Sequence, residues 1–126
     1  DEIDVLRIHK EAFKEMCNLR FLKIYSKKWD QKKEVRWHLP RGFNYFPHKL
    51  RLLRFDGFPM KCMHSNFCPE NLVKLQMQGS KLKRLWKGVH LLRGLKSIDL
   101  RGSRSLKEIP DLSMATNLLS FFFWFS

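Results

Sequence analysis

The sequence predicts an α/β fold: a curved solenoid of stacked repeats, with short parallel strands on the concave face and irregular, 3-10 or short helical segments on the convex face. A six-residue pattern, apolar-x-x-apolar-x-apolar, recurs along the chain, and its last four starts are separated by 22, 23 and 23 residues. A glycine stands seven residues after each of the three central starts, at Gly57, Gly79 and Gly102. The clear copies start at residues 19, 50, 72, 95 and 118.

The spacing of this pattern explains why the repeats should stack. The fourth and sixth residues of each copy point to the same side of a short strand, and the first residue is buried where the strand begins. The phased glycine lets the chain turn tightly off the strand. One repeat cannot cover its own apolar side, whereas stacked repeats share a continuous core. The pattern therefore predicts a leucine-rich-repeat solenoid of about five repeats.

We expect two regions along the chain. Residues 1–18 form an N-terminal partial repeat, with a faint copy of the pattern at Ile3, Leu6 and Ile8, followed by a helical junction. The helical prediction covers residues 9–18, in which three apolar residues fall on one face at helical spacing. Residues 19–126 hold the repeats, and the aromatic run at the end predicts that the last repeat is cut short. The three apolar residues of the junction are Ala12, Phe13 and Met16.

The first gap between repeats is 31 residues, which implies an insertion of about eight residues within the basic segment 26–40. Its mixture of cations and tryptophans could bind nucleic-acid phosphates and stack bases. We favour a solvated loop whose tryptophans fold back onto the scaffold. The cations are Lys27, Lys28, Lys32, Lys33 and Arg36, and the tryptophans are Trp29 and Trp37.

The segments that return from one strand to the next differ in character. Residues 56–71 contain two prolines and predict an irregular loop. Residues 80–94 place four apolar residues at helical spacing and predict a short 3-10 or α turn. Residues 103–117 contain Pro110, which favours an extended or 3-10 return. The four apolar residues are Leu82, Leu85, Trp86 and Val89.

Composition favours acidic partners. The formal net charge is +13, from 25 Lys and Arg against 12 Asp and Glu, and a basic chain is attracted to acidic proteins, nucleic acid or anionic surfaces. Three cysteines do not predict a disulfide framework, and they favour a reducing compartment. The longest apolar run, residues 121–125, is far shorter than the roughly 20 residues that a membrane span needs.

No residue set predicts catalysis, a cofactor or a metal. Cys62, His64 and Cys68 lie within seven residues, but a structural zinc site needs four ligands and no second cluster supplies the others. No nucleophile elbow, phosphate loop or metalloprotease motif occurs. We therefore expect a protein that is not an enzyme and that carries no cofactor.

The outward positions of the strands predict the functional surface. The third, fifth and seventh residues of each repeat should form ladders about 5 Å apart on the concave face. Tyrosine and arginine are enriched among residues that dominate binding energy. The candidate interaction surface consists of Phe21, Lys23, Tyr25, Arg54, Asp56, Lys74, Gln76, Gln78, Asp99 and Arg101.

Three segments, AFKEMCNLRFLKIY (12–25), ENLVKLQMQGSKLKRLWKGV (70–89) and LKSIDLRGSRSLKEIPDLSMATNL (95–118), resemble a known family. They are similar to the first repeats of plant disease resistance proteins of the Toll/interleukin-1-receptor, nucleotide-binding, leucine-rich-repeat class. The signatures LWKG (85–88) and IPDLS (109–113) are specific, and the resemblance covers residues 1 to about 118. Ser103 stands where the family often has cysteine.

The resemblance implies a role beyond what the residues show. In that class, a signalling domain and a nucleotide-binding switch domain precede the repeats, and the repeats help to hold the switch inactive and to recognise pathogen effectors. The chain contains no motif of either domain. We therefore expect a recognition module of an intracellular plant immune receptor, in the cytoplasm or the nucleus. Its partners would be proteins: an effector, the receptor's own nucleotide-binding domain, or both.

Two other binding functions are weaker. A basic nucleic-acid-binding segment is the main alternative, although the positive charges are spread over every repeat rather than gathered in one motif. An extracellular receptor domain would carry an asparagine ladder and glycosylation sequons. The ladder position here holds Phe58, Ser80 and Ser103, and no sequon occurs.

Overall fold

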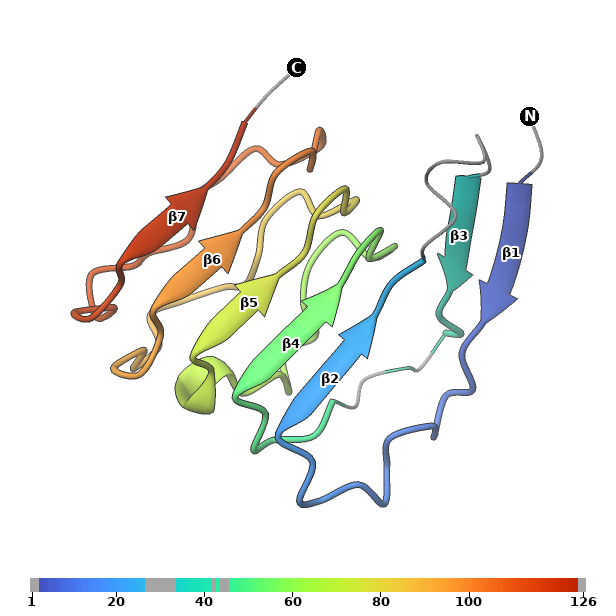
Figure 1. Ribbon diagram of the computed structural model, residues 1–126, viewed down its shortest axis with the longest axis horizontal. Coiled ribbons are helices and arrows are strands. Elements are labelled where there is room, and N and C mark those ends of the chain that lie inside the picture. The colour runs from blue at the N-terminus through green and yellow to red at the C-terminus, as the bar shows by residue number, and fades with distance from the viewer. Residues whose placement is uncertain (1–2, 27–33, 42, 44–45, 125–126) are drawn as a thin grey trace.

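The computed structural model describes residues 3–26, 34–41, 43 and 46–124, and these residues form two parallel sheets (Figure 1). The smaller sheet pairs β1 (Ile3–Arg7) with β3 (Glu34–His38). The larger sheet has the order β2-β4-β5-β6-β7, so each strand pairs with its neighbour along the chain once β3 is set aside. Its strands are β2 (Phe21–Ile24), β4 (Leu52–Phe55), β5 (Lys74–Gln76), β6 (Ser97–Asp99) and β7 (Ser120–Phe122).

The strand register follows the spacing of the repeat pattern. The fourth residues of the five patterns pair in one continuous row, Leu22 with Leu53, Leu75, Ile98 and Phe121. The three central members of this row are fully buried, and the two outer members pack against the core while partly exposed. The sixth residues, from Ile24 to Phe123, contribute to the same core. Apolar burial along this row is the main stabilising contribution to the stack.

The three phased glycines turn the chain at the end of their strands, as predicted. Gly57, Gly79 and Gly102 have φ values of 71°, 63° and 75°, in the left-handed region. A Cβ atom at Gly102 would also lie 3.6 Å from the backbone nitrogen of Gly79. Glycine is favoured here because other L residues are strained at positive φ.

A short buried polar ladder follows two of these turns. Ser80 and Ser103 are 4% and 0% exposed, and their hydroxyl oxygens lie 2.7 Å apart. The Ser103 hydroxyl donates to the Met77 carbonyl at 3.1 Å, and the Ser80 amide donates to the Ser103 oxygen at 3.3 Å. Phe58, at the same position one repeat earlier, is buried in the core instead. The ladder therefore satisfies backbone groups that the sheet leaves unpaired.

The helical predictions are wrong within the described residues. The described residues contain one helix, the 3-10 turn Pro69–Asn71. They contain no helix that is long and apolar enough to cross a membrane. Residues 9–18 make separate tight turns, and residues 80–94 form an irregular return. In the return, the amides of Lys81 and Lys83 donate to Phe58 and Lys61 of the preceding segment, each at 2.8 Å. These amides are thus used between repeats rather than within a helix.

The segment 26–40 is a strand in its second half, which corrects the loop prediction there. Residues 34–38 form β3 because they pair with β1. The strand β1 contains the faint first copy of the repeat pattern. Leu6, expected inside, is 45% exposed. Trp37 does fold back: its Nε1 donates to the Asp56 carbonyl at 2.9 Å, and its ring contacts the Phe55 ring edge to face. Trp29 and residues 27–33 lie outside the described residues.

Candidate interaction surface

One side of the five-stranded sheet carries the residues that alternate with the core positions, and we call it the outer face. The fifth residues of the repeats pair across the strands, Lys23 with Arg54, then Gln76, Asp99 and Phe122. Exposure varies along this face from 65% at Phe21 to 3% at Asp99. The predicted residues therefore share one face, but they differ in how far solvent or a partner can reach them. The outer face consists of Phe21, Lys23, Tyr25, Leu52, Arg54, Asp56, Lys74, Gln76, Gln78, Ser97, Asp99, Arg101, Ser120, Phe122 and Trp124.

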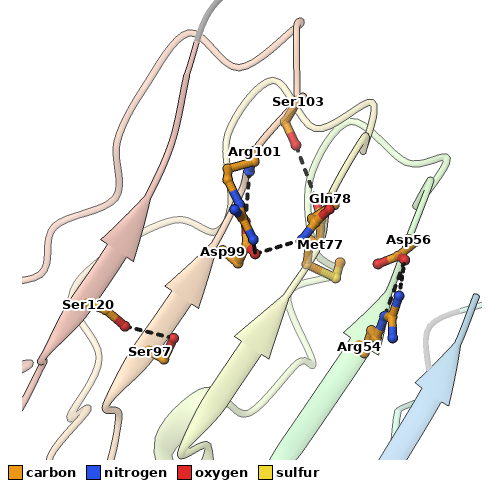
Figure 2. A network of polar contacts seen from close by, with 9 residues as sticks. All are labelled: Arg54, Asp56, Met77, Gln78, Ser97, Asp99, Arg101, Ser103 and Ser120. Atoms are coloured by element: carbon orange, nitrogen blue, oxygen red, sulfur yellow. Dashed lines mark hydrogen bonds and ion pairs between the residues drawn. The ribbon is translucent and has the colours of Figure 1, made fainter.

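An arginine and an aspartate from one strand end form the first fixed group on this face (Figure 2). Arg54 donates from Nε at 3.2 Å and from Nη2 at 2.8 Å to Oδ2 of Asp56. The Arg54 guanidinium also lies 4.1 Å from the centre of the Tyr25 ring. The hydrogen bond with Asp56 raises the pKa of Arg54, although partial burial opposes this change. Both contacts limit the rotamers of Arg54 before any partner binds.

The second fixed group is also an arginine–aspartate pair, but here the aspartate, Asp99, comes before the arginine, Arg101, along the chain. Arg101 donates from Nε to Oδ1 of Asp99 at 2.9 Å and from Nη2 to Oδ2 at 2.7 Å, a bidentate pair. The Arg101 amide and the Gln78 side chain donate to the same carboxylate at 3.1 and 2.7 Å. Burial raises the pKa of Asp99, but the hydrogen bonds from Arg101 and Gln78 outweigh it and leave that pKa below its ordinary value. The buried Asp99 carboxylate therefore holds the side chains of Arg101 and Gln78 in place.

Aromatic side chains extend the second group toward β7. The Arg101 guanidinium lies 4.9 Å from the centre of the Phe122 ring and 5.6 Å from that of Trp124. Phe122 and Trp124 are 46% and 51% exposed, so they present apolar area beside a cation. The Ser120 hydroxyl donates to the Ser97 hydroxyl at 3.0 Å and so links β7 to β6 (Figure 2). The candidate surface predicted from the sequence did not include these two aromatic residues.

The remaining candidate residues lie on the face without such contacts. No hydrogen bond or ion pair joins the side chains of Lys23, Lys74 or Gln76 to another residue in the described part of the chain. Lys23 and Lys74 are exposed, and Gln76 is half-buried. The structure thus links Tyr25, Arg54 and Asp56 into one group and Gln78, Asp99 and Arg101 into another. The first group lies at the ends of β2 and β4, and the second lies at the ends of β5 and β6.

The arrangement is suited to binding. Two arginines with fixed geometry, each stacked on an aromatic ring, offer remaining N–H donors, and large apolar rings lie beside them. Among the described residues, no three His, Cys, Asp or Glu side chains gather where they could hold a metal ion. The cysteines Cys17, Cys62 and Cys68 are free thiols.

Comparisons with known proteins point to one group of relatives. The Leucine Rich Repeat family model matches residues 71–89. The disease resistance protein RPS6 of Arabidopsis thaliana is 71% identical over 118 residues, which cover 94% of this chain and 10% of that protein. RML1A and TAO1, also disease resistance proteins of Arabidopsis thaliana, are 47% and 42% identical over 92% and 90% of the chain, respectively. The chain spans about a tenth of the length of these relatives, 10% or 11%.

Proposed function

This chain is a leucine-rich-repeat segment of the plant disease resistance protein class that combines Toll/interleukin-1-receptor, nucleotide-binding and leucine-rich-repeat domains, and we propose that it acts as a protein-recognition module of an immune receptor. The outer face is the recognition surface, and it forms the concave side of a curved solenoid. The recognition module acts in the cytoplasm or the nucleus. The observation that supports the proposal most directly is the pair of pre-organised arginine groups on this face.

Pre-organisation matters because ordering side chains weakens binding. Each rotamer-rich side chain that is immobilised on association costs about 0.5–1.5 kcal/mol. Arg54 and Arg101 are already held by Asp56 and Asp99 and by aromatic rings, so much of this cost falls on folding instead. A partner that presents acceptors to these arginines would therefore bind more tightly than exposure alone suggests.

The partner is a protein: a pathogen effector, the nucleotide-binding domain of the same receptor, or both. Charge supports an acidic partner surface, because the chain carries a net charge of +13. A hollow of about 480 Å³ at the amino ends of the strands adds to this, since Arg20, Lys49 and Arg51 line it and Glu70 is its one acid among the described residues. Docking of the switch domain on the outer face would hold that domain inactive.

The test uses the nucleotide-binding domain of the 71% identical Arabidopsis protein as the probe. We expect saturable binding to the 126-residue chain in calorimetry, weakened by about tenfold in Arg54→Ala and in Arg101→Ala. Arg104→Ala and Lys107→Ala remove the same charge from exposed positions of a returning segment and should change the affinity by less than about twofold. Equal losses in all four variants would show that net charge, and not the outer face, controls binding.

Binding to nucleic acid is the alternative function, supported by the net charge of +13. Such binding would weaken steeply with salt, with a slope set by the number of phosphates contacted. Fluorescence anisotropy with a labelled single-stranded RNA and a DNA duplex at low salt distinguishes the two functions. Absence of binding there rules out the alternative.

A further inference from the structure

Two returning segments enclose a hollow of about 310 Å³ that shares no residue with the outer face. One wall comes from residues 62–67, after β4, and the other from residues 84–90, after β5. We call it the Trp86 hollow. A volume of about 300 Å³ is at the lower end of the range for small-molecule sites.

The walls of the Trp86 hollow are held together by hydrogen bonds between the two segments. The Met63 amide donates to the Leu85 carbonyl at 3.0 Å, and the Lys83 amide donates to the Lys61 carbonyl at 2.8 Å. The Cys62 thiol lies 3.8 Å from the same Leu85 carbonyl. The hollow is therefore part of the folded repeat structure and is formed before any ligand enters.

The charge of the lining favours an anion. Arg84 and Lys87 are the basic side chains of the lining besides the histidines, and neither has an ion-pair partner among the described residues. His64 accepts the Asn66 amide at Nδ1, so its neutral form carries its proton on Nε2. None of the described residues that line the hollow is an acid. The nearby carboxylate, Glu70, lies outside the lining and is paired with His90 at 3.3 Å.

The floor of the hollow is aromatic. The rings of Phe67 and Trp86 stack with centroids 6.4 Å apart, and both residues are 7% exposed. The buried Nε1 donor of Trp86 has no hydrogen-bond partner within the described structure. A buried donor without a partner is uncommon in folded proteins. The rings of Phe67 and Trp86 give the lining an apolar surface on which the nonpolar part of a ligand can pack.

An apolar hollow of about 80 Å³ adjoins the first, because Cys62 and His64 line both. Three phenylalanines and a methionine complete its lining: Phe43, Phe46, Phe58 and Met60. The two spaces together offer cations at one end and an apolar recess at the other.

We propose that the Trp86 hollow binds a carboxylate carried on an apolar group, with the carboxylate held by Arg84 and Lys87 and the apolar part packed on Phe67 and Trp86. The ligand is either a small organic acid or an acidic side chain of a partner protein beside an apolar residue. Both present the same chemistry to the lining. This site is separate from the outer face, so it would serve a second binding event in the same receptor segment.

The experiment titrates the 126-residue chain with three probes and follows backbone amide signals by NMR. The probes are phenylacetate, its neutral analogue phenylacetamide, and an N-acetylated Phe-Glu dipeptide amide. We expect saturable shifts at residues 84–87 with the anionic probes and binding at least about tenfold weaker for phenylacetamide. Preference for phenylacetate assigns a small acid, and preference for the dipeptide assigns a protein side chain.

Variants separate the site from general charge attraction. Arg84→Ala and Lys87→Ala should each weaken binding by about tenfold. Lys81→Ala and Lys83→Ala remove the same charge from exposed positions of the same segment, outside the lining, and should change it by less than about twofold. Circular dichroism checks that each variant is folded. Equal binding of phenylacetamide, equal losses in all four variants, or no saturable binding of either anionic probe would overturn the proposal.

Discussion

Replacing Ser103 by alanine tests whether the buried serine ladder stabilises the stack of repeats. The Ser103 hydroxyl has one hydrogen, and it is donated to the Met77 carbonyl at 3.1 Å. Its oxygen must therefore accept from the Ser80 amide at 3.3 Å and from the Ser80 hydroxyl at 2.7 Å. Ser103→Ala removes all three contacts at a position that is 0% exposed.

The magnitude follows from the groups that lose their partner. A buried donor or acceptor that is left without a partner costs about 1–3 kcal/mol. The Met77 carbonyl and the Ser80 amide both lose the Ser103 oxygen, while the Ser80 hydroxyl can rotate toward another acceptor. We expect the free energy of unfolding to fall by about 2–4 kcal/mol. In a domain of this size, that corresponds to a decrease in Tm of roughly 10 °C.

Urea denaturation followed by circular dichroism measures the change, with Ser105→Ala as the control. Ser105 lies on the same returning segment but is exposed, so its replacement should cost less than about 0.5 kcal/mol. Ser103→Cys retains a weak donor, and its free energy of unfolding should lie between those of the two alanine variants. If Ser103→Ala is no more destabilising than Ser105→Ala, the ladder does not stabilise the stack.

Three further predictions concern single positions. Gly102→Ala should lower the free energy of unfolding by about 1–2 kcal/mol because φ is 75°, whereas Gly94→Ala, outside that region, should cost less in the same urea assay. Asp99→Asn should cost about 2 kcal/mol at pH 7. The pKa of Asp99 is lower in the folded protein than in the unfolded chain, so its contribution to stability is complete above the unfolded pKa of about 3.9 and is lost as pH falls through the folded pKa. The stabilities of the wild type and the variant should therefore converge in acid. A difference that stays constant with pH would contradict this assignment. Trp37→Phe should cost about 1 kcal/mol by loss of the 2.9 Å hydrogen bond to a backbone carbonyl, and an unchanged Tm would show that this bond contributes nothing.

The candidate surface was predicted from the sequence only as far as side-chain direction allows. A strand alternates its side chains between two faces, so once Leu53 and Phe55 are assigned to the core, Arg54 must lie on the other face. Alternation does not state which neighbours a side chain contacts. The pairing of Arg101 with Asp99, and its stacking on Phe122, depend on rotamers that only the packed strands define.

The sequence by itself determined the repeats, their strand positions and the three glycine turns, because apolar spacing and positive-φ glycine are local properties of the chain. Tertiary structure decided the rest. Residues 34–38 became a strand because β1 offered a parallel partner, and the return after β5 stayed non-helical because its amides found carbonyls in the preceding repeat. The Trp86 hollow likewise exists only between two returning segments. Backbone hydrogen bonds must be satisfied somewhere, and distant parts of the chain that come together in the fold determine where.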